Sequence, residues 1–229
     1  PGAAQYTPVL PWLAALRPFA LTSVSQFRPT GPSALASDLY ARDFNEVKRY
    51  GSRDSSQTTP AQRELARFHT ETPHVQMARN VRQFSQLRGF SLSDNARFFA
   101  QLYVTLGDAV ITGWEAKYTR NFWRPSTAIR AADIDGNPLT ERDTTWNAFV
   151  PTPPHPEYVA GHGCTWGSFA HTIEQFVGTP NVSGTLTSTT GAPRPFTNIG
   201  QITAESIDGR VFGGMHFRTS CEQGIAVGR

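Results

Sequence analysis

The 229-residue chain has very little cysteine, only Cys164 and Cys221. Two cysteines are too few for a disulfide framework, and their spacing does not match a zinc motif. Cys164 follows His162 and Cys221 follows His216, so the two sulfurs would be close if both histidines faced one site. The alternatives at this stage are one disulfide between the two cysteines and a pair of free, buried thiols.

The chain also lacks a long uninterrupted apolar run and a block of like charge. Its most apolar stretch, residues 96–114, is interrupted by Arg97, Gln101 and Asp108. This composition predicts a buried helix and no membrane span. Charged residues make up 17% of the chain, and its net charge of +3 is spread without a Lys/Arg block. This balance favours small anionic partners over nucleic acid.

Strand-like alternation is almost absent, and helical spacing predominates, so we expect an all-α fold. The spacing, capping residues and glycines predict helices over residues 33–50, 59–69, 73–89, 91–114, 164–177 and 202–212, and another from residue 217. Prolines in residues 1–32 predict an extended segment that wraps over the rest, and residues 181–195 read as a surface loop or lid. We expect one domain, 1–229; the absence of an initial Met indicates processing or a fragment.

Fixed positive charge is concentrated among aromatic residues in residues 117–125. Lys117 and Arg124 are seven residues apart, so a helix through both would present them on one face, which Arg120 could share. A planar guanidinium and a compact ammonium together suit a tetrahedral oxyanion. The alternative is a solvated basic face beside a helix that stops at Pro125.

Two later segments add to this one: Ala160, Gly161 and His162, and Arg210 with His216. Taken singly, a histidine in a Gly-rich turn is more often a satisfied polar residue than a ligand. In this order, however, the three segments resemble the signature of the superfamily of vanadium-dependent haloperoxidases and type 2 phosphatidic acid phosphatases. Residues 122–130, 135–137, 153–158 and 212–218 are similar to the bacterial haloperoxidase-like branch. The resemblance implies a helical bundle of the vanadium haloperoxidase and acid phosphatase type.

The resemblance also implies a cofactor site for vanadate, which phosphate could also occupy. Its equatorial oxygens would be bound by the side chains of Lys117, Arg124 and Arg210 and by the amide of Gly161. The ring of His216 would be the direct ligand of the metal. Vanadium would act as a Lewis acid that activates hydrogen peroxide, so that halide is oxidised to hypohalous acid. The implied partners are hydrogen peroxide, a halide and a small organic substrate; a homo-oligomer is an open alternative.

Three further positions have roles in the family. The resemblance makes His162 the acid/base on the side opposite His216. It places Trp114 and His155 in the halide pocket, and a histidine at position 155 favours bromide. His155 could also be an inert residue of its Pro-rich loop.

Two other functions remain open. In a soluble phosphatase, His216 would form a phosphohistidine and His162 would protonate the leaving alcohol. In a degenerate oxyanion-binding protein, the fold would persist without catalysis. Ala160 and Gly209 keep this last alternative open, because the family normally has serine at both positions.

Overall fold

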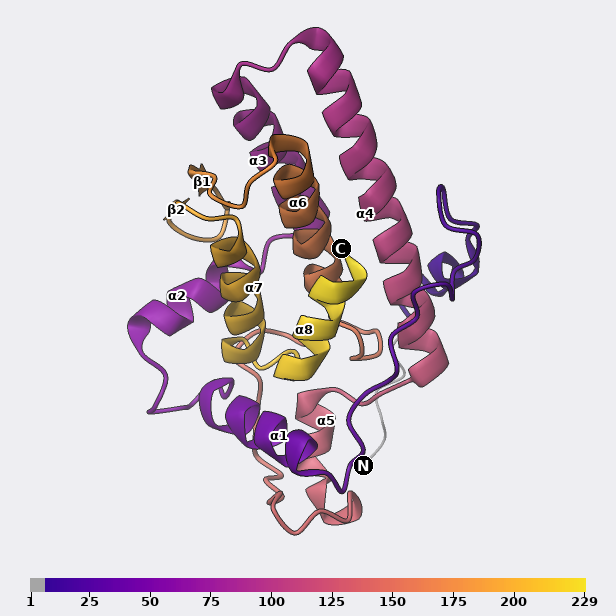
Figure 1. Cartoon of the computed structure of the whole chain (residues 1–229). Helices are drawn as coiled ribbons and strands as arrows, with labels where there is room; N and C mark the ends of the chain where they lie inside the picture. The colour runs from indigo at the N-terminus through magenta and orange to yellow at the C-terminus, as the bar shows by residue number, and fades with distance from the viewer. Residues whose placement is uncertain (1–6) are drawn as a thin grey trace.

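The computed structural model describes residues 7–229 and is mostly helical, which confirms the predicted all-α class (Figure 1). The α-helices are α1 (Asp38–Tyr50), α2 (Pro60–Phe68), α3 (Pro73–Arg88), α4 (Leu92–Arg120), α5 (Pro125–Arg130), α6 (Gly161–Val177), α7 (Gly200–Phe212) and α8 (Arg218–Val227). Two short 3-10 helices, η1 (Pro11–Ala15) and η2 (Ala132–Ile134), and two strands, β1 (Gly184–Leu186) and β2 (Arg194–Phe196), complete the described elements.

Local sequence accounts for several helix ends. At the start of α2, Thr59 and Gln62 form the predicted capping box around Pro60, which needs no amide partner there. The Ser91 hydroxyl accepts from the amide of Asp94 at 3.1 Å and caps α4. α3 ends at Gly89, whose φ of 61° suits a residue without a Cβ.

The main core lies where α6 packs against both α4 and α8, with α7 beside α6 (Figure 1). Its largest fully buried side chains include Phe98 of α4 and Trp166 and Phe169 of α6. A second apolar cluster joins α1 to α5 and the end of α7. Because both clusters are built from helices distant in sequence, they bring residues 117–124, 155–162 and 210–216 to one region.

The predicted wrapping segment, 1–32, is described from residue 7 onward, and residues 1–6 lie outside the described part. Along the outer side of α4 (Figure 1), η1 packs against that helix. The buried carboxylate of Asp108 accepts three successive backbone amides from this segment, those of Phe19, Ala20 and Leu21, at 2.6, 2.8 and 3.0 Å. One carboxylate on α4 therefore anchors the wrapping segment.

Two expectations about the chain path were wrong. α4 ends at Arg120, and Asn121 has a φ of 45°, so Lys117 and Arg124 do not share a helical face. Arg124 has an extended backbone and precedes α5 as its N-cap residue. Arg120 points elsewhere, because its guanidinium donates to the carbonyls of Pro29 and Thr30. The turn after Arg120 redirects the chain, which helical spacing could not reveal.

The expected loop or lid at residues 181–195 is partly a hairpin, since β1 pairs antiparallel with β2. Its connection is tied to α3 by Asn80, whose side chain bonds the backbone of Thr187, and Glu71 accepts from the amide of Thr189. Within the described residues, no helix has the length and hydropathy needed to cross a bilayer. The disulfide alternative is not supported, because Cys164 and Cys221 are both free and buried.

Candidate oxyanion site

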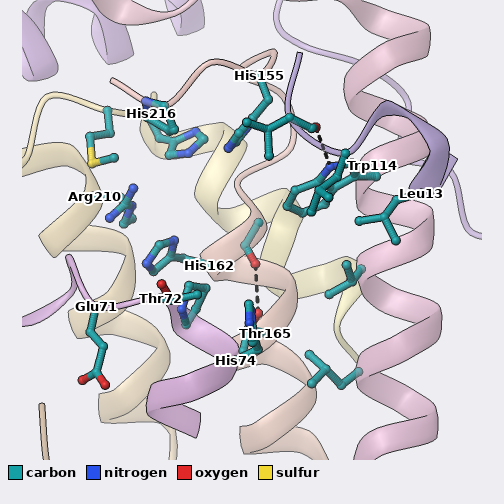
Figure 2. Close-up of a pocket in the computed structure, with 18 of the residues that line it drawn as sticks. Leu13, Glu71, Thr72, His74, Trp114, His155, His162, Thr165, Arg210 and His216 are labelled. Carbon is teal, nitrogen blue, oxygen red and sulfur yellow. Dashed lines mark hydrogen bonds between the residues drawn. The ribbon is translucent and has the colours of Figure 1, made fainter. Parts of the chain in front are cut away.

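A cavity of about 1180 Å³ lies between α4, the wrapping segment and the ends of α6 and α7. Leucines and aromatic rings from α4 and residues 9–19 line its outer part. The lining also includes polar side chains, among them His155, His162, Arg210 and His216 (Figure 2). A confined space with an apolar wall and a few convergent polar groups is a typical small-molecule site.

The first turn of α6 forms one edge of this cavity. The helix begins at Gly161, three residues earlier than predicted, so His162 lies in the first turn and its neighbouring amides have no partner within the helix. A Cβ at position 161 would lie 3.0 Å from the indole of Trp114, which explains why glycine is present. Ala160 is the N-cap residue and provides no side-chain cap.

Arg124 is the central cation of the site and is almost fully buried. Its Nε donates to the carbonyl of His155 at 2.9 Å, and Nη1 donates to the carbonyl of Met215 at 2.8 Å. Nη1 also lies 3.1 Å from Nε2 of His216, and Nη2 lies 2.9 Å from Nδ1 of His155. Because a guanidinium can only donate, both imidazole nitrogens act as acceptors.

Lys117 lies behind this arginine with no solvent exposure. Its ammonium donates to the carbonyls of Pro156 and Glu157 at 2.9 and 3.0 Å. Lys117 and Arg124 do not line the cavity, whereas Arg210 does. The three predicted cations therefore converge on one region in two layers, with Arg210 in the layer that faces the cavity.

Arg210 and His162 have unused hydrogen-bonding capacity. Arg210 donates through Nη1 to the carbonyl of His69 at 2.8 Å, but its buried Nε has no partner among the described residues. The buried Nε2 of His162 also has none. Gly209, beside Arg210, packs so closely that a Cβ there would lie 2.7 Å from the ring of His69. The close packing of α2 on α7 therefore accounts for glycine in place of the family's serine.

Glu157 is a residue of the site that sequence reasoning did not single out. Its side chain is fully buried, and Oε1 accepts from Nδ1 of His216 at 2.9 Å and from the amide of Phe217 at 3.0 Å. Glu157 is the only acidic residue in the Pro-rich stretch 151–160. A carboxylate isolated in an apolar, Pro-rich segment was the signal that could have identified it.

Burial and mutual repulsion set the charges of the site. The pKa of Arg210 falls to about 9 and that of Arg124 to about 10, both mainly through burial, and the pKa of Lys117 falls as well. Burial, together with the neighbouring cations, lowers the pKa of His162 and of His216 far below that of a free imidazole. The imidazoles are therefore neutral at pH 7.

One buried carboxylate, that of Glu157, lies near Arg124 and Lys117. Burial raises the pKa of Glu157 to about 7, opposed by Arg124 and Lys117. The carboxylate of Glu71 also lines the cavity, but it is paired with Arg79. Lys117, Arg124 and Arg210 therefore give this region more positive charge than Glu157 balances. Such a surplus in a water-poor space favours a bound anion.

His155 and Trp114 form the wall between the polar and apolar parts of the cavity. Their ring centroids are 5.4 Å apart (Figure 2). Burial and the nearby cations lower the pKa of His155 to about 2. Nδ1 lies 2.9 Å from the donor Nη2 of Arg124 and 3.2 Å from the carbonyl oxygen of Pro156. The shorter contact with the charged donor favours a neutral ring that carries its proton on Nε2. His155 can therefore offer an uncharged N–H donor beside an indole.

Comparisons with known proteins agree with this arrangement. Residues 97–229 match the family model described as the VCPO second helical-bundle domain. The vanadium chloroperoxidase of Curvularia inaequalis is 31% identical over 93 residues, which cover 37% of this chain and 15% of that protein. The chain therefore spans a small part of the length of this curated relative.

Two solved structures superpose over nearly the whole chain. A bacterial vanadium-dependent iodoperoxidase has a TM-score of 0.80 and 26% identity, covering 99% of this chain and 57% of its own. A holo-type bacterial vanadium-dependent chloroperoxidase has a TM-score of 0.76 and 18% identity, and the match covers 100% of this chain and 55% of the chloroperoxidase chain. The second likeness concerns the fold alone. Since the family model covers more than half of its residues, this chain belongs to the vanadium haloperoxidase family.

Proposed function

We propose that this chain holds the vanadate site of a vanadium-dependent haloperoxidase, which oxidises halide with hydrogen peroxide to hypohalous acid. One observation carries the proposal: three buried cations and three neutral imidazoles converge on one region, where Glu157 is the only nearby carboxylate among the described residues that is not paired with an arginine. The family membership and the similarity to a chloroperoxidase and an iodoperoxidase support it.

The residues present fit vanadate. The unpaired Nε of Arg210 and Nε2 of His162 are buried polar atoms at the cavity, and His216 has an unprotonated Nε2. Arg210, Arg124 and Lys117 would bind the oxygens with the Gly161 amide, and His216 Nε2 would be the direct ligand. When bound, vanadate supplies a Lewis acid that polarises hydrogen peroxide.

The remaining steps belong to the side chains of this chain. His162, neutral and buried, would accept a proton at Nε2 from the peroxide and return it to the leaving oxygen. The buried cations hold the anion charge without reorganising, and the start of α6 adds its partial positive charge. To reach the oxyanion, Arg124 must redirect donors that now bond His216 and His155. Lys117 must likewise redirect a donor from the carbonyls of Pro156 and Glu157.

The halide proposal is bromide. His155 presents its Nε2–H next to Trp114, so a large, weakly hydrated halide would receive one neutral donor and one aromatic edge. An uncharged donor limits how strongly the pocket can compensate the dehydration of chloride. We expect His155→Phe to lower the ratio of bromide turnover to chloride turnover, because the variant lacks the N–H donor.

A phosphatase function uses the same atoms. The His216 Nε2 lone pair is equally suited to attack phosphorus, and His162 could protonate a leaving alcohol. Vanadate and phosphate have the same shape and charge type, so the geometry of the cations does not discriminate between them. An assay must therefore distinguish phosphatase activity from haloperoxidase activity.

The experiment measures bromination of a dye with hydrogen peroxide, with and without added vanadate, and hydrolysis of a phosphate monoester without vanadate. A haloperoxidase brominates only after vanadate is added, and inorganic phosphate inhibits it competitively. Hydrolysis without bromination would select the phosphatase. Tight phosphate binding with neither activity would select a degenerate oxyanion-binding protein. Arg210→Ala should abolish vanadate-dependent activity, with the exposed Arg142→Ala as its control.

A further inference from the structure

The carboxylate of Glu157 occupies a position that has no role in the function proposed above. It has no solvent exposure, and it links three parts of the site. Its Oε1 accepts from the His216 ring at 2.9 Å and from the Phe217 amide just before α8 at 3.0 Å. Its own carbonyl accepts from Lys117 at 3.0 Å. One residue thus connects the buried lysine to the histidine.

The contacts of His216 determine which ring nitrogen carries the proton. Arg124 has only donors, so the His216 Nε2 that lies 3.1 Å from Nη1 must be an acceptor. A neutral ring with an unprotonated Nε2 carries its proton on Nδ1. Nδ1 lies 2.9 Å from Glu157 Oε1, which can accept it whether or not the other carboxylate oxygen, Oε2, is protonated.

We propose that Glu157 is a positioning residue that holds His216 as the Nδ1–H tautomer, with the Nε2 lone pair available to an oxyanion centre. Arg124 imposes the same tautomer, but an oxyanion competes for its donors. Once Arg124 has turned to the anion, Glu157 alone specifies the proton position. A second hydrogen bond to Phe217 fixes the carboxylate itself, so the ring has a fixed orientation as well as a fixed tautomer.

This role of Glu157 predicts different effects on the binding of vanadate and of phosphate. Vanadate uses the Nε2 lone pair as a ligand, whereas inorganic phosphate at rest is bound through its oxygens by the cations. Loss of Glu157 should therefore weaken vanadate binding more than phosphate binding. Gln at the same position retains an oxygen that can accept from Nδ1, so it should restore the wild-type behaviour.

The test compares Glu157→Leu and Glu157→Gln with wild type by long-range ¹H–¹⁵N correlation spectra and by calorimetric titration of vanadate and phosphate. His216→Gln identifies the His216 signals. Wild type should show Nδ1–H with and without added phosphate. In E157L the Nε2–H population should grow as phosphate is titrated in and takes the donors of Arg124. The vanadate affinity of E157L should fall on the order of 10- to 100-fold, with a much smaller loss for phosphate and near-recovery in E157Q.

Glu115→Leu is the matched control, because Glu115 is also a buried carboxylate but pairs with Arg28 and Thr119 away from the cavity. It should change neither the tautomer nor the vanadate-to-phosphate ratio. An Nε2–H tautomer in wild type overturns the inference even if E157L does not fold. Equal losses for both anions, or an Nδ1–H tautomer that persists in phosphate-saturated E157L, also overturn it. The vanadate arm rests on the proposed function: if wild type binds no vanadate, that function fails, while the spectra still decide the role of Glu157.

Discussion

A serine hydroxyl at position 160, where this chain has Ala160, could both cap α6 and donate to a bound oxyanion. As the N-cap residue of α6, Ala160 leaves the first amides without a side-chain acceptor, and it lies next to Gly161 and His162. We expect Ala160→Ser to raise the free energy of unfolding by about 1 kcal/mol, because a serine N-cap accepts from the first turn. It should also tighten vanadate binding by offering one more donor.

Urea unfolding and vanadate titration measure both effects. Ala226→Ser, an exposed change inside α8, is the control and should be neutral or slightly destabilising. An A160S protein with lower stability and unchanged vanadate affinity would show that position 160 has no room for the hydroxyl.

His162 gives a second prediction at the residue scale. Its side chain lines the cavity, and its buried Nε2 has no hydrogen-bond partner among the described residues, although the backbones of His69 and Glu71 lie near the ring. His162→Ala should reduce kcat for bromination on the order of 100- to 10,000-fold, as expected for loss of a general acid/base. Vanadate affinity should fall far less, because the cations remain. Steady-state kinetics beside vanadate titration separate the two, with His171→Ala on the same helix as the control. A parallel loss of affinity and kcat would contradict an acid/base role.

At the scale of elements, the Glu71 and Arg79 pair joins the α2–α3 connection to the segment before β2. The Arg79 hydrogen bond is the main cause that lowers the pKa of Glu71 to about 2, from 4.5 in the unfolded chain. A lowered folded-state pKa means that this stabilisation is complete above about pH 4.5 and is lost as the pH falls towards 2.

The expected size is about 1 to 2 kcal/mol, since the Arg79 side chain is partly exposed and screened by water. Urea unfolding of wild type and Glu71→Gln at pH 6, 4.5 and 3 measures it. The stability difference between the two proteins should be largest at pH 6 and shrink at pH 3. A difference that stays constant with pH would show that the carboxylate charge contributes nothing.

A comparison of predicted and observed helices shows which ends the capping residues and the apolar spacing could predict. The capping residues Thr59 and Ser91 predicted the starts of α2 and α4, and Gly89 predicted the end of α3, because these signals act within a few residues. The end of α4 was missed, since the helix continues to Arg120. The hairpin β1–β2 was missed, since its strands are three residues long and are stabilised by contacts with α3 and α2. The break between Lys117 and Arg124 was missed because Asn121 adopts a left-handed conformation that few sequence patterns signal.

At the scale of the whole molecule, Asp108 decides whether the wrapping segment stays on α4. Removal of its carboxylate leaves three backbone amides of residues 19–21 without their acceptor. Asp108→Ala should weaken docking of this segment by about 2 to 4 kcal/mol, because charge-assisted bonds are lost from a buried group. Limited proteolysis should then cut within residues 9–27 faster than in wild type.

Asp133→Ala removes a largely exposed carboxylate and is the control for this experiment. The same segment forms the outer wall of the cavity, so D108A should also raise the KM for an apolar organic substrate more than the KM for bromide. Unchanged proteolysis in D108A would show that apolar contacts of η1 are sufficient for docking.

The sequence by itself named the candidate site residues, since cations and histidines recurring in a fixed order have a recognisable chemistry. Residue types and short-range signals likewise determined the all-α class and most helix ends. Tertiary structure alone decided that Lys117 and Arg124 lie behind the cavity that Arg210 faces, and that Glu157 meets His216. The reason is that pairing between residues 59 positions apart depends on how α6, α7 and α8 pack, which no local pattern encodes.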